Sequence, residues 1–131
     1  VRRGLQSLPA QENEYPARAA ARKNSKNPDY HFCYHAPTLI IASNLADYGN
    51  AMADCAAALE NILLAAHSLG LGSCWINQLT WLSDTAAVRD YLFSLGIPYT
   101  HRICGAAAIG YTKGSYPQAP LRKPGTIHRI L

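Results

Sequence analysis

The sequence predicts a single domain that combines helices with buried strands, and three features support this prediction. Residues 50–69 are rich in alanine and repeat with the period of a helix, and a glycine turn follows them. Residues 38–43 and 103–111 are runs of apolar or small residues between turn residues, as expected of buried strands. A further helix is expected from Ser83 or Asp84 to about Ser94, because apolar side chains recur on one face. The length of 131 residues fits one domain.

The alanine-rich helix is expected to be mostly buried. Its polar residues fall within an arc of about 140°, whereas the rest of its circumference is Ala, Leu, Ile, Met and Cys. Asn50 is a candidate N-cap, and Gly70 or Gly72 is expected to take the left-handed conformation that ends a helix. Such a helix suits either the core of an ordinary domain or a dimer interface that leads into a cofactor loop. The polar residues are Asp54, Glu60, Asn61, His67 and Ser68.

The small side chains of residues 105–108 need a close partner, because they cannot fill the space beside a strand. The alanine-rich helix is the natural candidate. Residues 73–77 are expected to be extended and to be followed by a short loop, and Gly96 and Pro98 are expected to end the second helix. A short β-like tail is expected over residues 126–131. Because two strands alone form a marginal sheet, the chain is expected to belong to a larger fold or to borrow strands from a partner.

The first 29 residues are predicted to be a polar, loosely ordered segment with one helical turn around residues 17–23, which leaves residues 30–131 as the folded part. Much of the net charge of +4 lies in this segment. Its basic residues could form a nucleic-acid arm, but no aromatic residues are interleaved with them and no helix-turn-helix pattern is present. A solvated segment that binds no nucleic acid is therefore the favoured interpretation.

Composition argues against membrane and metal-binding classes. No run approaches the ~18 apolar residues of a membrane helix, and the first residues lack the apolar core of a signal peptide. The cysteines form no C-x-x-C pair, and the five histidines lack the spacing of a metal site or a catalytic triad. We expect free, buried thiols in a reducing compartment, and hence a cytoplasmic protein. The cysteines are Cys33, Cys55, Cys74 and Cys104.

Several motifs occur in a specific order after residue 30. They are a strand, the alanine-rich helix, GLGSCWINQL, a capped helix, GIP, a small-residue strand that ends in GY, and AP-x-RKPG. In this order the chain resembles the FMN-dependent nitroreductase family from about residue 30 to residue 125. The Arg-rich first element of the family, and a later loop with Ser, Asn and Gln-Pro-Trp, have no counterpart. The chain thus resembles the later part of the family domain, and Arg2 and Arg3 are interpreted as a chance likeness to the first element.

The resemblance implies an α+β fold: a nitroreductase-like sandwich with a mostly antiparallel sheet flanked by helices, in an intertwined homodimer. It also implies FMN as cofactor and NADH or NADPH as co-substrate. Electrons would pass to nitroaromatic, quinone or flavin-type acceptors by a ping-pong route.

The resemblance implies cofactor contacts at particular positions of this sequence. It assigns no catalytic side chain, since the hydride chemistry takes place on the flavin. Trp75, Ile76, Asn77 and Gln78 match the family strip along the isoalloxazine ring, with the main-chain N–H of Asn77 facing flavin N5. A donor at N5 favours hydride acceptance, and a backbone N–H does not titrate. Arg122, together with Lys123, matches the late basic residue that holds the FMN phosphate.

Two further hypotheses remain beside the oxidoreductase. The missing Arg-rich element favours a non-catalytic remnant, which would be a dimerisation or flavin-carrying module of the same fold. A basic nucleic-acid-binding module depends only on residues 1–26. An absorption spectrum would distinguish them, because bound oxidised flavin is coloured.

Overall fold

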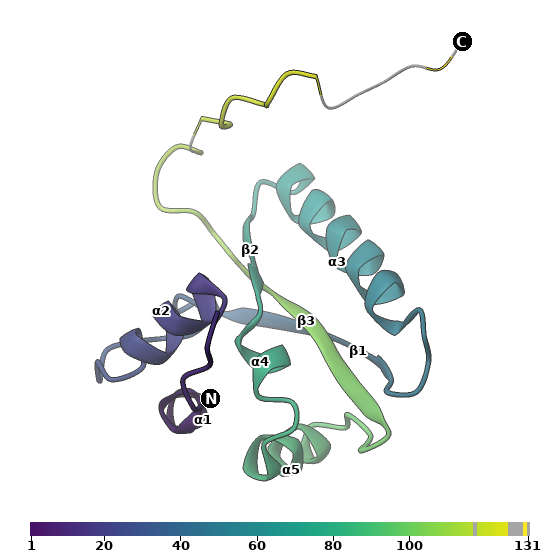
Figure 1. The fold of residues 1–131 in the computed structure, drawn as a ribbon. Helices are drawn as coiled ribbons and strands as arrows, with labels where there is room; N and C mark the ends of the chain where they lie inside the picture. Colours follow the sequence, from purple (N-terminus) through teal and green to yellow (C-terminus); the bar gives the residue numbers. More distant parts are fainter. Residues whose placement is uncertain (117, 126–129, 131) are drawn as a thin grey trace.

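The computed structural model describes residues 1–116, 118–125 and 130, and these form helices on both sides of a small sheet (Figure 1). The fold is α+β, as expected. The elements in chain order are α1 (Arg2–Ser7), α2 (Pro16–Asn24), β1 (Thr38–Leu45), α3 (Ala51–Ser68), β2 (Gly72–Ile76), α4 (Gln78–Trp81), α5 (Ala86–Ser94) and β3 (His101–Gly110).

Within the described residues the sheet has three strands in the order β1-β3-β2, and both pairings are antiparallel. β3 lies in the middle of the sheet (Figure 1). The expected strands at residues 38–43 and 103–111 are confirmed, and the extended segment at residues 73–77 proves to be the third strand. The register of β1 on β3 shifts between Ala42 and Ser43, so that Cys104 has no partner in β1.

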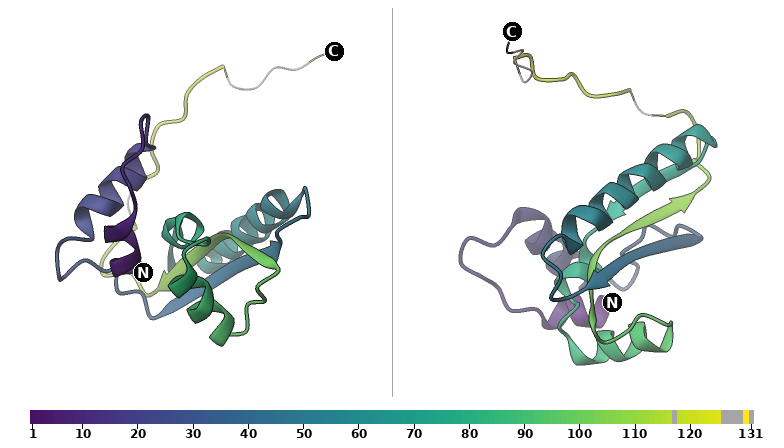
Figure 2. Two further views of the ribbon diagram at one scale, coloured as in Figure 1. Left: turned by 60° about the horizontal axis from the view of Figure 1, so that its bottom comes forward. Right: turned by 90° about the vertical axis from the view of Figure 1, so that its right-hand side faces the viewer.

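The sheet separates two unequal layers of helices. α3 contacts all three strands on one face, and Ala51, Cys55 and Cys104 form a small apolar cluster there. The main core lies against the opposite face and joins residues of α1, α2, α4 and α5 to β2 and β3 (Figure 2). Its largest fully buried side chains are Leu5, Ile76 and Leu82.

The small residues of β3 admit α3 closely, as the sequence predicts. Ala107 is 0% exposed, whereas Ala106 and Ala108 belong to the main core on the opposite face. A Cβ atom added at Gly105 would lie 2.8 Å from Leu59 Cδ1 and 2.9 Å from Trp75 Cζ2. Glycine is therefore required at this position by the approach of the helix and of the indole ring.

We expect Gly105→Ala to lower the free energy of unfolding by about 1–3 kcal/mol, because the new methyl group must displace a side chain in a packed layer. Urea unfolding followed by circular dichroism measures the change. Gly49→Ala is the matched control, since nothing lies within 4 Å of the added Cβ. Its effect should stay within about 0.5 kcal/mol. Equal stability of the two variants would show that α3 and Trp75 do not approach Gly105 this closely.

α3 is less buried than its sequence predicts. One stripe, Ala51, Cys55, Leu59 and Ala66, is buried against the sheet. The rest of the helix is largely exposed, with Leu64 at 59% and Met52 at 42%. The prediction of a mostly buried helix is wrong for this single chain, because the helix lies on the outside of one sheet and only one stripe can contact it. The alanine residues exposed in the structure are Ala53, Ala57, Ala58 and Ala65.

The N-terminal segment folds, contrary to the expectation of a loosely ordered stretch over residues 1–29. α2 confirms the helical turn expected around residues 17–23, but α1 was not expected. Leu5, Ala21 and Ser25 are 0–4% exposed. The amide of Gln6 donates to the Ser25 carbonyl at 2.6 Å and joins the two helices. The sequence is misleading here because very few apolar residues, placed on two short helices, suffice to bury one side of each.

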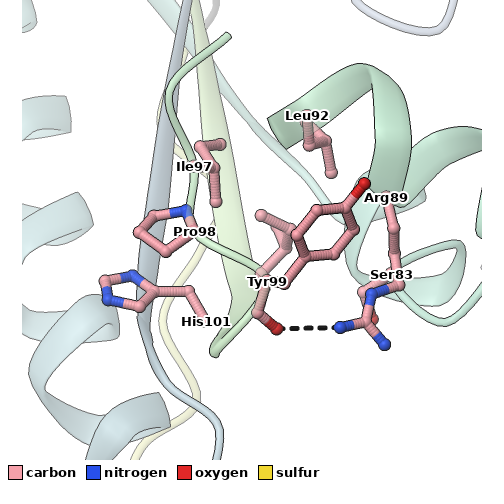
Figure 3. Close-up of a pocket in the computed structure, with 8 residues that line it drawn as sticks. Ser83, Arg89, Leu92, Ile97, Pro98, Tyr99 and His101 are labelled. Carbon is pink, nitrogen blue, oxygen red and sulfur yellow. Dashed lines mark hydrogen bonds between the residues drawn. The ribbon is translucent and has the colours of Figure 1, made fainter. Parts of the chain in front are cut away.

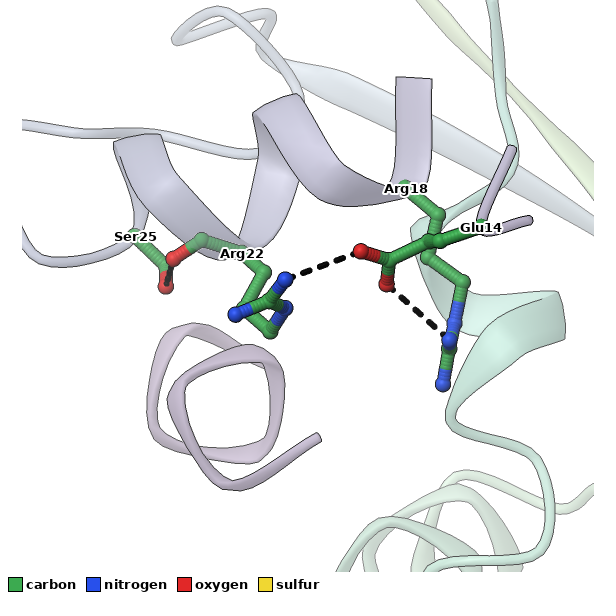
Figure 4. A network of polar contacts seen from close by, with 4 residues as sticks. All are labelled: Glu14, Arg18, Arg22 and Ser25. Atoms are coloured by element: carbon green, nitrogen blue, oxygen red, sulfur yellow. Dashed lines mark hydrogen bonds and ion pairs between the residues drawn. The ribbon is translucent and has the colours of Figure 1, made fainter. Parts of the chain in front are cut away.

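A carboxylate with two arginine partners fixes the start of α2 (Figure 4). Glu14 accepts from Arg18 at 3.0 Å and from Arg22 at 2.9 Å. Its side chain is only 7% exposed. The hydrogen bond from Arg22 is the main cause that lowers the pKa of Glu14, with the charges of both arginines adding to it and desolvation opposing it. The carboxylate therefore favours the folded state in its ionised form.

We expect this contribution to be present above the unfolded pKa of a glutamate, about 4.3, and to be lost as the pH falls through the lowered folded value. Unfolding by urea at a series of pH values tests this in the parent and in Glu14→Gln. The stability of the parent should fall more steeply below about pH 4.3 than that of the variant. Glu12→Gln, at an exposed neighbour, should behave as the parent does. If the stability of Glu14→Gln and that of the parent depend on pH in the same way, the ion pairs of Glu14 do not have this role.

Other boundaries agree in part with the sequence. Asn50 precedes α3 as expected, although its side chain makes no capping hydrogen bond. Gly70 takes the left-handed conformation that ends α3, with φ of 73°. α5 is preceded by Thr85, so the predicted caps Ser83 and Asp84 are wrong. The loop expected after Asn77 contains the short helix α4. The β-like tail expected at residues 126–131 lies outside the described residues, apart from residue 130.

Candidate functional site

Residues 75–78 form a strip where β2 ends and α4 begins. Ile76 is 1% exposed and belongs to the main core, so its side chain holds the strip against that core. Trp75 pairs with Ala107 in the sheet and is half-buried, with its ring against the α3 side of Gly105. Asn77 is exposed. The strip is therefore firmly held by the core, and Asn77 is its exposed residue.

Two side-chain hydrogen bonds define the strip. The indole Nε1 of Trp75 donates to Asn77 Oδ1 at 2.8 Å. The amide of Gln78 donates to the hydroxyl oxygen of Tyr30 at 3.3 Å. The side chain of Asn77 is thus engaged with Trp75. Tyr30 becomes a neighbour of the strip that the sequence did not reveal, since it lies 48 residues away.

The predicted phosphate-binding residues are not brought to the strip. Arg122 and Lys123 are exposed and lie in the segment that follows β3. This segment runs away from the body of the domain, past the end of α3 (Figures 1 and 2). Leu121 beside them is fully exposed. Their role in binding phosphate stays a prediction.

An open cavity of about 660 Å³ lies beside the first residues of β2. Its walls are residues 33–37, the start of β2 and the end of β3. Cys74 is exposed there, so the expectation that all four cysteines are buried is wrong for this one. Partial desolvation nevertheless raises the pKa of Cys74, so its thiol stays protonated at neutral pH. Nothing in the site activates it as a nucleophile.

Cys33 and Cys55 are inert for the same reason. Desolvation is the main cause that raises the pKa of Cys33, and it raises that of Cys55 to about 11, with further contributions from Cys104. All four cysteines are free. Among the residues described, no three His, Cys, Asp or Glu side chains are grouped so that they could hold a metal ion.

Two further cavities lie away from the strip. A groove of about 990 Å³ is lined by residues of β1, α4 and α5, by residues 30–32 and by the N-terminal residues, with Arg2 and Arg3 among them. A cavity of only about 20 Å³, room for about one water molecule, lies between α5 and the start of β3 (Figure 3). Arg89 closes it by donating to the Tyr99 carbonyl at 2.8 Å. This small cavity is a packing feature.

No helix in the described part of the chain has both the length and the apolar character that crossing a membrane requires.

The comparisons with known proteins agree with the fold and extend to the N-terminal helices. The model of the nitroreductase family matches residues 1–111. The match begins at residue 1, whereas the likeness seen in the sequence begins near residue 30. It ends before Arg122 and Lys123.

Among solved structures, the chain is similar to a nitroreductase with bound FMN from Bacteroides fragilis NCTC 9343. The two are 38% identical with a TM-score of 0.83, over 98% of this chain and 65% of that chain. It also resembles an FMN-dependent nitroreductase from Clostridium difficile R20291, at 23% identity and a TM-score of 0.64, over 86% of this chain and 68% of that one. The second similarity concerns the fold alone.

Among curated proteins, the chain is similar to the "Putative NADH dehydrogenase/NAD(P)H nitroreductase" of Archaeoglobus fulgidus. The two are 38% identical over 79 residues, which make up 58% of this chain and 44% of that protein. The chain therefore spans less than two thirds of the length of either 38%-identical relative.

Proposed function

Because the chain belongs to the nitroreductase family, we propose that it acts in an FMN-dependent NAD(P)H oxidoreductase. The electrons would pass to nitroaromatic, quinone or flavin-type acceptors. One observation carries the proposal: 98% of the chain superposes on a 38%-identical nitroreductase whose structure holds FMN. The NAD(P)H part is supported by the name of the Archaeoglobus fulgidus relative.

The 75–78 strip fits a flat cofactor. It places the exposed Asn77 next to Ile76, which anchors the strip in the core. Because Asn77 Oδ1 accepts from the Trp75 indole, the asparagine side chain is held toward Trp75, and the main chain is left as the polar group for a ring. Bound FMN would supply the hydride-accepting ring, and the N–H of Asn77 would lie at its N5 position. Arg122 and Lys123 would hold the phosphate.

We further propose that two copies of the chain form a homodimer through α3. The exposed side of this helix carries Leu64 and Met52 at 59% and 42% exposure, among alanines that permit close approach. These apolar side chains and small alanines stand among the exposed polar residues Asp54, Glu60, Asn61, His67 and Ser68, so they support a helix contact of mixed character. The dimer would also bring a second β-sheet near the first. The strands of two chains together would offset the small number in one chain.

A non-catalytic module of the same fold is the alternative. One observation favours it: the predicted phosphate ligands Arg122 and Lys123 lie on an exposed segment away from the strip. Such a protein would dimerise or carry flavin without turnover. A cytoplasmic location stays a prediction, in line with four free cysteines.

The two half-reactions distinguish an enzyme from a carrier. The protein is loaded with FMN, and the bleaching of oxidised flavin by NADH or NADPH is followed without oxygen. A quinone or a nitroaromatic compound is then added, and the return of the oxidised spectrum is recorded. The rates of both steps should increase with the concentration of the protein. Flavin that stays bound and oxidised in the presence of both nucleotides would favour the carrier.

We expect Arg122→Ala to weaken FMN binding by roughly ten- to a hundredfold without lowering stability, because it removes a charge-assisted contact to phosphate. The quenching of FMN fluorescence measures the dissociation constant, and urea unfolding measures stability. Lys23→Ala is the matched control, since it removes one exposed positive charge from α2. If Arg122→Ala and Lys23→Ala bind FMN equally well, Arg122 is not a phosphate ligand.

A further inference from the structure

The segment that joins α2 to β1 contains a strained turn. Tyr34 and His35 take φ angles of 55° and 58°, which are left-handed values at two consecutive residues that are not glycine. Side chains with a Cβ atom adopt this region at a cost in free energy, so other contacts must hold the turn in place. The amide of Tyr34 donates to the His31 carbonyl at 3.0 Å, and that of Ala36 to the Cys33 carbonyl at 2.9 Å.

His31 supplies the remaining contacts. The backbone N–H of His35 donates to His31 Nδ1 at 3.2 Å. Cys33 Sγ lies 3.3 Å from the same nitrogen. The rings of His31 and His35 stack with their centroids 4.4 Å apart. Because a backbone N–H can only donate, Nδ1 must be the acceptor, and the neutral ring carries its hydrogen on Nε2.

The protonation state of His31 therefore decides whether these two side-chain contacts of the turn are made. Desolvation raises the pKa of Cys33, so its thiol keeps its hydrogen and donates to Nδ1. Protonation of His31 would place a hydrogen on Nδ1, so that the amide of His35 and the thiol of Cys33 would both face a donor. Histidine is the side chain that changes charge between about pH 5 and 8.

The surroundings of His31 add positive charge. Its ring lies on the 990 Å³ groove, whose other ionisable groups are the Val1 amino group, Arg2, Arg3, Tyr30 and Tyr91. Within its own loop it faces Cys33 and His35. The nearest carboxylate along the chain is the exposed Asp29, and the groups that line the groove or contact the ring supply none beside the backbone N–H of His35. The contact thus exists only with the neutral ring.

We propose that His31 is an acid-sensitive latch, which holds the 33–37 loop in its strained turn while the imidazole is neutral and releases it when the ring is protonated. The loop lines the 660 Å³ cavity together with the start of β2 and the end of β3. The cavity therefore changes shape on acidification, directly beside the 75–78 strip. The latch depends on no cofactor.

Hydrogen exchange of the backbone amides tests the latch. The protection of the His35 amide is measured by NMR at about pH 7.5 and about pH 5.5, on either side of the ordinary histidine range, and corrected for the intrinsic pH dependence of exchange. In the parent it should fall on the order of fivefold to tenfold at the lower pH, the size expected for one hydrogen bond. Unchanged protection would overturn the proposal.

Three variants make the test specific. His31→Asn places an acceptor oxygen near the position of Nδ1 and does not titrate, so protection should persist at both pH values. His31→Ala should be unprotected at both, and protection in this variant at the higher pH would count against the latch. His67→Asn, on α3, is the control and should behave as the parent does. If the protection of the His35 amide still falls with pH in His31→Asn, the effect belongs to another group and the proposal is overturned.

Discussion

Replacement of Asn77 by proline should slow the reduction of bound flavin by on the order of a hundredfold or more, the effect of removing one preorganised donor from a reacting centre. Proline has no backbone N–H and fixes φ near −65°. Asn77 has φ of −98° and directly precedes α4, so the substitution also shifts the end of the strip. Both changes act on the group that the proposed function places at flavin N5.

Asn77→Ala is the matched control, and its effect should be small. Alanine and proline both remove the Oδ1 atom that accepts from the Trp75 indole, so this loss is common to the two variants. The difference between them isolates the backbone N–H and its conformation. Stopped-flow reduction by NADH or NADPH measures the rate, with FMN occupancy determined for each variant.

Two outcomes would require revision of the site. If the proline variant reduces its flavin as fast as the parent at equal occupancy, the strip does not lie against N5. If alanine is as damaging as proline, the asparagine side chain itself contacts the cofactor or the substrate.

A charged residue on the exposed side of α3 should strongly weaken association. Ala58→Glu and Ala57→Arg are both on exposed positions of the single chain, so each variant should fold. If two copies meet through α3, either change buries a charge without a partner. The dissociation constant of the dimer should then rise by roughly a hundredfold or more.

Analytical ultracentrifugation over a range of concentrations measures the association. Lys23→Glu reverses an exposed charge on α2 and should leave the oligomeric state as in the parent. A parent chain that stays monomeric at high concentration would contradict the dimer. The same conclusion would follow if the α3 variants associate as the parent does.

Much of the fold after residue 37 could be predicted because local signals and packing agree there. The alanine-rich helix, its left-handed Gly70 and the small residues of β3 each follow from side-chain size and backbone conformation. α1 and α2 could not be predicted with the same ease. Each buries very few residues, such as Leu5 and Ala21, and periodicity is weak in segments this short.

The burial of α3 was misjudged for a different reason. Composition shows which side chains are apolar, but it does not show whether a second layer covers them. A single sheet can bury only one stripe of a helix, and Leu64 and Met52 remain exposed. Whether another copy covers them is a question of assembly, which the sequence of one chain does not answer.

The candidate site was predicted from the sequence only as a stretch of backbone. Residues 75–78 lie at the end of a strand that was predicted, so their position followed. The contacts of Trp75 with Asn77 and of Gln78 with Tyr30 depend on the loops around α4 and before β1. Gln78 and Tyr30 lie 48 residues apart, and no pattern in the sequence links them. The left-handed turn at Tyr34 and His35 has no signal either, since neither residue is glycine.

Titration of the protein with FMN, followed by visible absorption and by flavin fluorescence, tests the central claim most directly. The proposed function predicts saturable binding of one FMN per chain, with quenched fluorescence and a shifted spectrum as the ring enters the protein beside Trp75. Binding should weaken in Arg122→Ala and persist in Lys23→Ala. A spectrum that remains that of free FMN up to about millimolar concentration, which corresponds to a binding free energy weaker than about −4 kcal/mol, would contradict it.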